Sequence, residues 1–328
     1  MGEFDLIRRY FTRPTPRAVL GVGDDCALLQ PRPGMQLAIS SDMLVEGRHF
    51  LSTVDPAALG HKALAVNLSD LAACGALPLA FTLALALPSA DAAWLEPFSQ
   101  GLLALADAHG CELVGGDTTR GPLNICITVF GEVPPGQALL RSGARMGDEL
   151  YVSGTLGDAR MALEVFRGTL SLPEAAFAQA RQRLERPTPR VALGLALRGV
   201  ASAAADISDG LLGDLGHILK ASGVGAVVDA DVTTNLIATR ADISCASGSF
   251  GLEKQREYAL AGGDDYELVF TAPANARQAV QAAAAQAQTP VTRIGLIEAR
   301  AAQGPAIRLV DADGQRLDLH LPGFDHFG

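Results

Sequence analysis

Short apolar runs alternate with longer helix-like patterns along the first part of the chain. We predict a helix at 56–74, because Asp55 can cap its start, Pro56 suits the first helical position and Gly75 lies just past its end. Helices are also predicted at 3–11 and 91–109. The apolar runs predict strands at 18–22, 36–41, 79–87, 111–115 and 123–133.

The second part of the chain repeats this alternation after a break. The Pro/Gly cluster VPPGQ at 133–137 and the polar turn RSGARMGDE at 141–149 indicate a domain boundary. We therefore expect an α/β (α+β) fold with two domains, at 1–140 and 141–328. In the second domain we predict strands at 149–153, 225–229, 266–271 and 306–310, and helices at 156–168, 173–185, 190–200, 209–222 and 275–287.

Aspartates stand where several apolar runs end, often directly after glycine or serine. Loops at strand ends are where α/β proteins place their active sites, although a single Asp in a turn more often caps its own backbone. Two carboxylates about 4 Å apart repel by roughly 4 kcal/mol at an effective dielectric near 20, so several converging acids need cations. We expect Mg²⁺, which prefers carboxylate and phosphate oxygens. The acids are Asp24, Asp25, Asp42, Asp117, Asp206, Asp209, Asp264 and Asp265.

Asp70 lies on a face of the predicted helix 56–74 that is small and polar. A solvated face usually carries Lys, Glu and Arg, and this one does not, so we predict that it faces a site. The stripe is Gly60, Ala63, Asn67, Asp70 and Cys74.

The segment DISDGLLGDLGHILKASG at 206–223 contains the residues that predict where a helix begins. Ser208 is predicted to cap the helix, Asp209 to lie in its first turn, and Gly223 to end it. Asp206 stands two residues before the cap, where helix capping does not explain it, and this position favours a metal ligand.

The formal charge of −10 argues against partners such as nucleic acid or an anionic membrane. Lysines stand only at 62, 220 and 254, so phosphate binding has to rest mainly on arginine, backbone N–H groups or metal ions. The five cysteines are scattered without CxxC, which is typical of reduced thiols in the cytoplasm. No apolar run is long enough to span a bilayer, and the P-loop, HExxH, GxSxG and protein-kinase signatures are missing.

Eight motifs occur in a distinctive order: GVGDDCALL, ISSDMLVEGRHF, KALAVNLSDLAACGA, LVGGDTTRG, LRSGA, DISDGL, GGDDYEL and GFDHF. With them the chain resembles the thiamine-monophosphate kinases, within the aminoimidazole-ribonucleotide synthetase-like ATP-binding superfamily. The resemblance runs from Gly2 to Phe327, and VEGRHF and GFDHF point to the thiamine family.

This resemblance implies an N-terminal domain that forms an intersubunit β-barrel in a homodimer, a separate C-terminal α/β domain, and ATP in the cleft between the two domains. It also implies transfer of phosphate from ATP to thiamine monophosphate, giving thiamine diphosphate. We expect direct in-line, Mg²⁺-assisted transfer without a phosphoenzyme, because the acceptor phosphate is already a nucleophile.

Residue roles follow from the same motifs. Asp25, Asp42, Asp70, Asp117 and Asp209 match catalytic positions. At Asp264 relatives often carry Glu, so the substrate contact there loses reach. The resemblance implies Mg²⁺ ligation by Asp25, Ser40, Ser41, Asp42, Asp70, Asp117, Asp206 and Asp209, ATP contacts by Gly116, Asp117, Arg141 and Ser208, and substrate contacts by His49, Asp264 and Phe324.

Three alternatives stay open. One is a sister enzyme, either a purine-pathway cyclising synthetase or a selenide-activating enzyme that needs a reactive thiol. Cys26 follows GVGDD, but the Ala-Leu-Leu run after it suggests core packing. The others are a metal-dependent phosphohydrolase and a non-catalytic nucleotide binder. Only the second of these would bind ATP without turnover.

Overall fold

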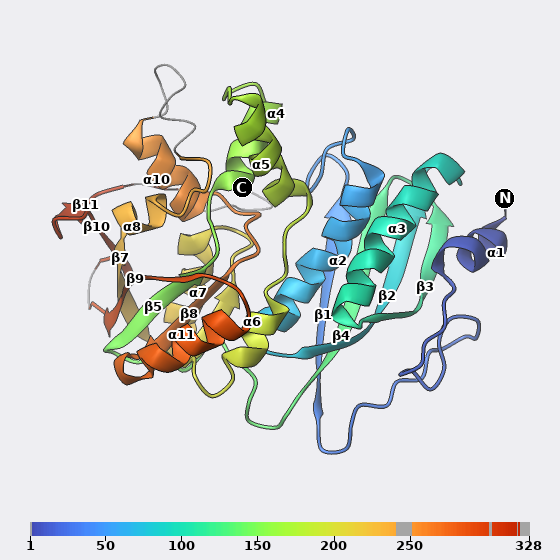
Figure 1. Cartoon of the computed structure of the whole chain (residues 1–328), viewed down its shortest axis with the longest axis horizontal. Helices are drawn as coiled ribbons and strands as arrows, with labels where there is room; N and C mark the ends of the chain where they lie inside the picture. Colours follow the sequence, from blue (N-terminus) through green and yellow to red (C-terminus); the bar gives the residue numbers. More distant parts are fainter. Residues whose placement is uncertain (1, 241–250, 302–303, 320, 322–328) are drawn as a thin grey trace. The chain divides into compact units, whose positions relative to one another are not determined.

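The computed structural model describes residues 2–240, 251–301, 304–319 and 321. The chain divides into two compact units, one of Met1–Leu71 with Ala76–Ala138 and the other of Ala72–Gly75 with Leu139–Gly328. Each unit is a mixed α/β layer structure (Figure 1). Phe324 and Cys245 lie outside the described residues.

The N-terminal unit is built on a four-stranded sheet of order β1-β4-β2-β3. Its strands are β1 (Gln36–Val45), β2 (Leu77–Leu87), β3 (Glu112–Arg120) and β4 (Asn124–Val133). β2 and β3 are parallel and the other pairs are antiparallel. The strands predicted at 36–41, 79–87, 111–115 and 123–133 are confirmed, but β1 and β3 run several residues further. Asp42 and Asp117 therefore lie inside strands and not at their ends.

Helices α2 (Pro56–Ala73) and α3 (Ala92–His109) cover one face of this sheet (Figure 1). Both confirm the predicted helices, and Asp55 caps α2 by accepting a hydrogen bond of 2.9 Å from the Ala58 N–H. The two helices approach closely through Gly60 and Gly101, since a Cβ on either would lie 2.1 or 2.0 Å from a backbone oxygen of the other helix. The expectation that Gly60 faces a site is therefore wrong, because it packs against α3.

The opposite face of the sheet is open within this unit. Along β1 the alternation leaves Leu37, Ile39 and Met43 between 43% and 60% exposed, while Leu44 is buried on the helix side. The described strands of this chain form no closed barrel.

The N-terminal segment lies along the β3 side of the unit. A short helix α1 (Glu3–Leu6) continues into a π-helical turn, η1 (Ile7–Phe11), which confirms the predicted helix. The strand predicted at 18–22 is wrong: Val19 is 63% exposed, and only isolated bridges form there. Glu112 accepts hydrogen bonds from the N–H groups of residues 17 and 18, so the run is held by a side chain and not by a strand partner.

The C-terminal unit is built on a seven-stranded mixed sheet of order β11-β10-β7-β9-β5-β8-β6. The strands are β5 (Asp148–Ser153), β6 (Ala203–Asp206), β7 (Val224–Asp229), β8 (Leu268–Pro273), β9 (Val291–Ala299), β10 (Ile307–Val310) and β11 (Arg316–Leu317). The helices are α4 (Asp158–Phe166), α5 (Glu174–Glu185), α6 (Val191–Ala196), α7 (Leu211–Ser222), α8 (Ala230–Thr234), α10 (Leu252–Ala261) and α11 (Arg277–Gln286), with a 3₁₀ turn η2 (Ala274–Ala276) before α11.

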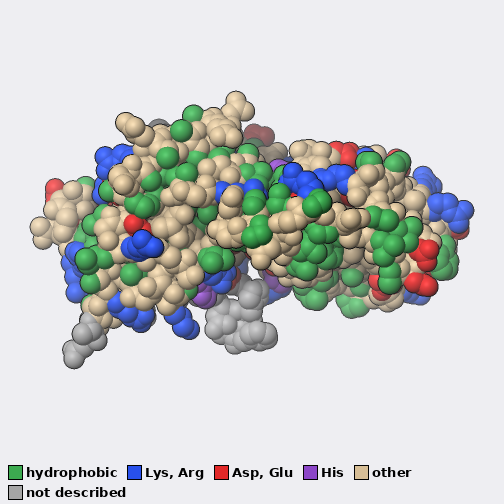
Figure 2. Space-filling view, turned by 90° about the horizontal axis from the view of Figure 1, so that it is seen from below, with side chains coloured by type: hydrophobic (Ala, Val, Ile, Leu, Met, Phe, Trp, Pro, Cys, Tyr) green, Lys and Arg blue, Asp and Glu red, His purple; other side chains and the backbone are tan. Residues whose placement is uncertain are grey.

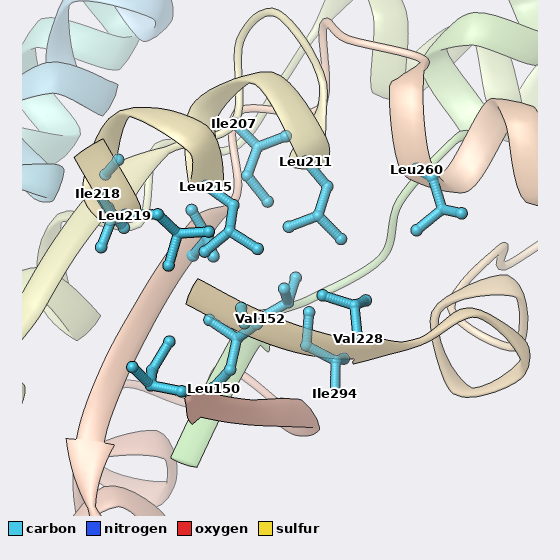
Figure 3. Close-up of a cluster of buried hydrophobic side chains, with 14 of the residues drawn as sticks. Leu150, Val152, Ile207, Leu211, Leu215, Ile218, Leu219, Val228, Leu260 and Ile294 are labelled. Carbon is cyan, nitrogen blue, oxygen red and sulfur yellow. The ribbon is translucent and has the colours of Figure 1, made fainter. Parts of the chain in front are cut away.

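Helix α7 supplies one side of the main core of this unit. Leu211, Leu215 and Ile218 point toward Leu150 and Val152 of β5 (Figure 3). The spacing i, i+4, i+7 puts these side chains on one stripe of the helix, as an amphipathic helix requires.

Sequence patterns missed β6, β9, β11, α8 and α10 in this unit. β6 is Ala-Ala-Ala-Asp, which lacks the β-branched and aromatic residues that mark strands. β9 contains Gly295, where a Cβ would lie 2.0 Å from the Val227 oxygen, so the close approach of two strands requires glycine there.

Charged and apolar side chains are mixed on the molecular surface, as the face in Figure 2 shows. Cys111 is buried, and burial raises the pKa of its thiol to about 12. Cys26 is exposed, so the expectation that it packs in the core is wrong. In the part of the chain that the structure describes, no helix is long and apolar enough to cross a membrane.

Candidate functional site

A cavity of about 540 Å³ in the N-terminal unit brings two of the predicted motifs together. Asp24 and Asp25 line it from the GVGDD turn, and Gly115 and Gly116 line it from β3. The Asp24 carboxylate accepts a hydrogen bond of 2.9 Å from the Asp25 N–H. The turn therefore holds its two acids at the wall of a cavity that the two glycines of β3 also line.

Gly116 is required by geometry. Its φ is +146°, and a Cβ would lie 1.8 Å from the Leu83 oxygen of the neighbouring strand. Asp117 follows it directly and is exposed. The close packing of β3 against β2 therefore explains the glycine, and the assignment of Gly116 to ATP stays a prediction.

A second group of polar residues joins β1 to α2. Ser40 donates a hydrogen bond from Oγ to Asp70, and the Asp42 N–H donates to Asn67 Oδ1 at 3.1 Å. Asn67 in turn donates to the Ala63 oxygen at 2.9 Å. Asn67 and Asp70 of the polar stripe thus face Asp42 and Ser40 of β1, and that these residues line a functional site stays a prediction.

Ser41 points to the other side of the sheet. Its Oγ lies 3.0 Å from Thr128 Oγ1 and donates to the Ile127 oxygen at 3.2 Å. Because successive side chains alternate across a strand, Ser40 and Asp42 share the helix-covered face and Ser41 does not.

The strand register shows how far apart the acids of this unit lie. Asp42 pairs with Ile127, which pairs with Leu83, which pairs with Gly116. Asp42 and Gly116 thus stand three strand spacings apart, roughly 14 Å at 4.8 Å per spacing. Within the described ranges, no group of three or more His, Cys, Asp and Glu side chains lies close enough to hold a metal ion.

His49 lies in the turn that follows β1. Its Nδ1 accepts a hydrogen bond of 3.0 Å from the Val45 N–H, so the neutral ring carries its proton on Nε2. Lys62, a buried residue of α2, donates to the His49 backbone oxygen at 3.3 Å. The turn is therefore fixed from two sides. No sequence pattern indicated that Lys62 lies near His49.

In the C-terminal unit, the predicted helix start at Ser208 is wrong. Helix α7 begins at Leu211 after Gly210, whose φ is +105°. The Asp214 carboxylate reaches back and accepts hydrogen bonds from the Ser208 and Asp209 N–H groups at 3.0 and 3.1 Å. Ser208 and Asp209 thus belong to a loop before the helix, and the acid of the first turn is Asp214.

Burial, and after it the nearby charge of Asp209, raise the pKa of Asp214 to about 7, against the opposing effect of the two backbone hydrogen bonds and the charge of Arg141. Asp206, the last residue of β6, is buried as well. This end of β6 therefore holds acidic side chains away from solvent, which disfavours their charged forms unless a positive charge lies nearby.

The GGDDYEL motif runs alongside the DISDG loop. The Asp264 N–H donates to the Ser208 oxygen at 2.8 Å, and the Tyr266 N–H donates to the Ile207 oxygen at 2.8 Å. Asp264 and Tyr266 have φ values of +60° and +50°, a conformation that costs on the order of 1–3 kcal/mol per residue. Two motifs that are far apart in the sequence therefore form one hydrogen-bonded pair of loops.

The remaining predicted residues fall outside these groups. Arg141 is exposed, and its backbone oxygen accepts from Ser222 Oγ at 3.2 Å. Phe324 lies outside the described residues. The pairing of Glu267, the glutamate of GGDDYEL, with Arg183 and Arg190 was missed because a pairing over about 80 residues leaves no local pattern.

Comparison with known proteins follows the same division of the chain. Residues 23–133 match the AIR synthase related protein N-terminal domain, and residues 145–306 match the corresponding C-terminal domain. A thiamine-monophosphate kinase of Salmonella typhimurium is 47% identical over 99% of this chain and 98% of its own length. That of Escherichia coli K12 is 46% identical over the same shares.

The chain belongs to the thiamine-monophosphate kinase family.

Solved structures agree with this membership. The thiamine-monophosphate kinase of Stenotrophomonas maltophilia K279a is 46% identical, covers 96% of both chains and has a TM-score of 0.80. The structure of AaThiL complexed with AMPPCP and TMP is 30% identical, covers 99% of this chain and 96% of its own, and has a TM-score of 0.74. The hydrogenase maturation protein HypE in complex with ATP shares the fold at 20% identity and a TM-score of 0.74.

Proposed function

We propose that this protein transfers the terminal phosphate of ATP to thiamine monophosphate and releases thiamine diphosphate and ADP. The observation that carries this proposal is the likeness over nearly the whole chain to AaThiL, which was solved with AMPPCP and TMP. The motif residues at the cavity, at the β1–α2 contact and in the paired loops of the C-terminal unit support it.

The donor atoms offered by these residues fit Mg²⁺. They are carboxylate and hydroxyl oxygens without thiolate or imidazole, and Ser40 already contacts Asp70. We assign the Mg²⁺ ions to Asp25, Ser40, Asp42, Asp70 and Asp117 of the first unit and to Asp206 and Asp209 of the second. Ser41, expected from the sequence as a further ligand, is left out because its hydroxyl lies on the face of the sheet opposite to Ser40 and Asp42. Bound Mg²⁺ neutralises phosphate charge, which this lysine-poor chain does not do alone.

Gly116 and Asp117, Arg141 and Ser208 are assigned to ATP. Gly116 has no side chain that would cover its backbone. Arg141 is exposed and positively charged. Ser208 lies in a loop that is held in place by the hydrogen bond from the Ser208 N–H to the Asp214 carboxylate. His49, Asp264 and Phe324 are assigned to thiamine monophosphate. The proton on His49 Nε2 makes that nitrogen a donor to the substrate phosphate.

Transfer is direct and in line, with no phosphoenzyme. The acceptor phosphate is a nucleophile near neutral pH, so the site has only to bring two phosphates together and neutralise their repulsion. Retention of labelled phosphate on the protein after reaction with γ-labelled ATP would contradict this mechanism.

The active form is a cytoplasmic homodimer in our proposal. The open face of the N-terminal sheet carries Leu37, Ile39 and Met43 exposed on β1, an apolar strip that pairing with a second copy in an intersubunit barrel would cover.

The test is an acceptor comparison with the purified protein, ATP and Mg²⁺. Thiamine diphosphate is expected from thiamine monophosphate and not from thiamine. Product from thiamine alone, or ATP binding without any diphosphate, would move the assignment to another member of the superfamily.

A further inference from the structure

A buried group of charges lies beside the GGDDYEL loop, and we call Glu267, Arg183, Arg190 and Ser153 the Glu267 network. Arg190 donates hydrogen bonds to the Glu267 carboxylate from two nitrogens, and its Nε lies 2.6 Å from Oε2. Arg183 Nη2 lies 2.7 Å from Oε1, and Ser153 Oγ donates to Oε2 at 2.6 Å. Glu267 is fully buried and the two arginines are nearly so.

The network holds the loop by its backbone. Arg183 Nη2 also donates to the Asp265 oxygen at 2.9 Å, and the Leu268 N–H donates to Ser153 Oγ at 2.8 Å. These contacts hold the middle of the turn Asp264–Tyr266 and the strand that follows it, and both ends of the turn have positive φ. Such a backbone persists only where its surroundings over-determine it, and here the network provides that constraint.

Inside the turn, Asp265 is buried among the same charges. Its Oδ1 accepts from the Gly157 N–H at 2.9 Å, and its Oδ2 has no hydrogen-bond partner among the residues described. Burial holds the pKa of Asp265 well above its usual range.

The turn also fixes the neighbouring loop. Asp264 and Tyr266 donate their N–H groups to the oxygens of Ser208 and Ile207, and the Ile207 N–H donates to the Glu267 oxygen, each at 2.8 Å. Any movement of Glu267 therefore moves the Ile207–Ser208 loop together with Asp264.

We propose that Arg183 and Arg190 are positioning residues for the phosphoryl transfer: through Glu267 they hold the strained Asp264–Tyr266 turn against Ile207–Ser208, and so keep the substrate-contacting and ATP-contacting loops at one spacing. This rests on the proposed function. A planar guanidinium fork suits the task, because two parallel hydrogen bonds fix the direction of the carboxylate, which the single ammonium group of lysine does not.

The test compares Arg190→Gln and Arg190→Lys with Arg181→Gln. Arg181 pairs with Glu185 on the surface of α5 and does not contact the Glu267 network, so its variant is the matched control. All proteins are assayed where circular dichroism shows them folded. We expect Arg190→Gln to raise the KM for thiamine monophosphate about tenfold, since small misplacements of positioning groups carry large kinetic costs, and Arg190→Lys to raise it less.

A second readout does not depend on turnover. Amide hydrogen exchange at Asp264 and Tyr266 is expected to quicken in Arg190→Gln and to stay unchanged in Arg181→Gln. A network that serves only stability would quicken exchange to the same extent across the whole C-terminal unit and leave the KM for thiamine monophosphate unchanged, and that result would overturn the proposal.

The two proposals fail separately. If the wild-type protein makes no thiamine diphosphate, the proposed function fails, and the exchange result alone decides whether the network holds the turn. If the wild type is active and a folded Arg190→Gln shows wild-type KM and exchange, the positioning role fails alone. Should Arg190→Gln not fold, Arg190→Lys gives the same decision, with wild-type values overturning the role.

Discussion

The position of a residue along a strand decides on which face of the sheet its side chain lies, as Ser40, Ser41 and Asp42 show. Their residue types made all three candidate metal ligands, but the strand period places Ser41 on the face opposite Ser40 and Asp42. Asp70 approaches the same face from α2 and accepts the Ser40 hydroxyl. Residue types and helix periodicity were enough to predict Asp70, whereas the face taken by each strand residue needed the register.

Replacing Asp70 with asparagine is expected to lower kcat/KM by about 100-fold or more, because loss of one preorganised charge near a transferring phosphate has effects of that order. The side chain keeps its size, so the melting temperature should stay close to that of the wild type. Asp107→Asn, at the surface pair with Arg13, is the control. Near-normal turnover of Asp70→Asn would remove this residue from the site.

Two substitutions of His49, to alanine and to asparagine, distinguish the two roles proposed for its ring, which are to close the turn and to contact the substrate. Asparagine can still accept the Val45 N–H through Oδ1 but lacks the Nε2 proton. Both variants are expected to raise the KM for thiamine monophosphate about tenfold, the equivalent of one lost hydrogen bond to a charged group, and to change the KM for ATP much less. A wild-type KM in His49→Asn would show that the ring only closes the turn.

At the scale of elements, long periodic segments could be predicted from the sequence and short ones could not. Helices α2 and α3 have caps and glycine ends written into their sequences, and both were confirmed. The apolar run at 18–22 was taken for a strand, but pairing depends on a free sheet edge that no local pattern reveals. The start of α7 was predicted at the wrong residue. Ser208 was expected to cap the helix, but it lies in a loop before the helix, where its N–H donates a hydrogen bond to Asp214.

Strand β5 carries a testable pH dependence at Glu149. Hydrogen bonding to Arg277, assisted by Tyr151 and the charge of Arg293, lowers the Glu149 pKa from 4.5 to about 2 despite burial. A lowered folded-state pKa stabilises the native state above pH 4.5, and this contribution is lost as the pH falls toward 2.

Glu149→Gln should therefore lower stability at pH 7 by about 1–3 kcal/mol, and the difference from the wild type should shrink between pH 4.5 and 2. Thermal melts across that range measure it, with Glu298→Gln, at the more exposed pair with Arg308, as the control. A difference that stays constant with pH would contradict the role given to the Glu149 charge.

At the scale of the molecule, the division into two α/β units and the family follow from the ordered motifs. What the sequence could not supply are contacts between distant segments. Asp264 meets Ser208 and Glu267 meets Arg190 through backbone and buried side-chain bonds that depend on the sheet order of the C-terminal unit. Neither the strained turn nor the arginines that hold it leave a periodic signal.

The open face of the N-terminal sheet gives the prediction for assembly. Ile39→Lys places a charge in the exposed apolar strip and is expected to shift the protein from dimer to monomer in size-exclusion chromatography with light scattering. Val19→Lys changes an equally exposed apolar residue outside the sheet and should leave the size unchanged. A dimer that survives Ile39→Lys would show that this face is not the interface.

The central claim is that a phosphate already on thiamine accepts the phosphoryl group of ATP, and the most direct measurement is the ratio of the two products. In one reaction with ATP, Mg²⁺ and thiamine monophosphate, chromatography quantifies ADP and thiamine diphosphate over time. Our account predicts equal amounts, with ADP formation falling to background when thiamine monophosphate is omitted. ADP released without matching thiamine diphosphate would contradict it and indicate a phosphohydrolase.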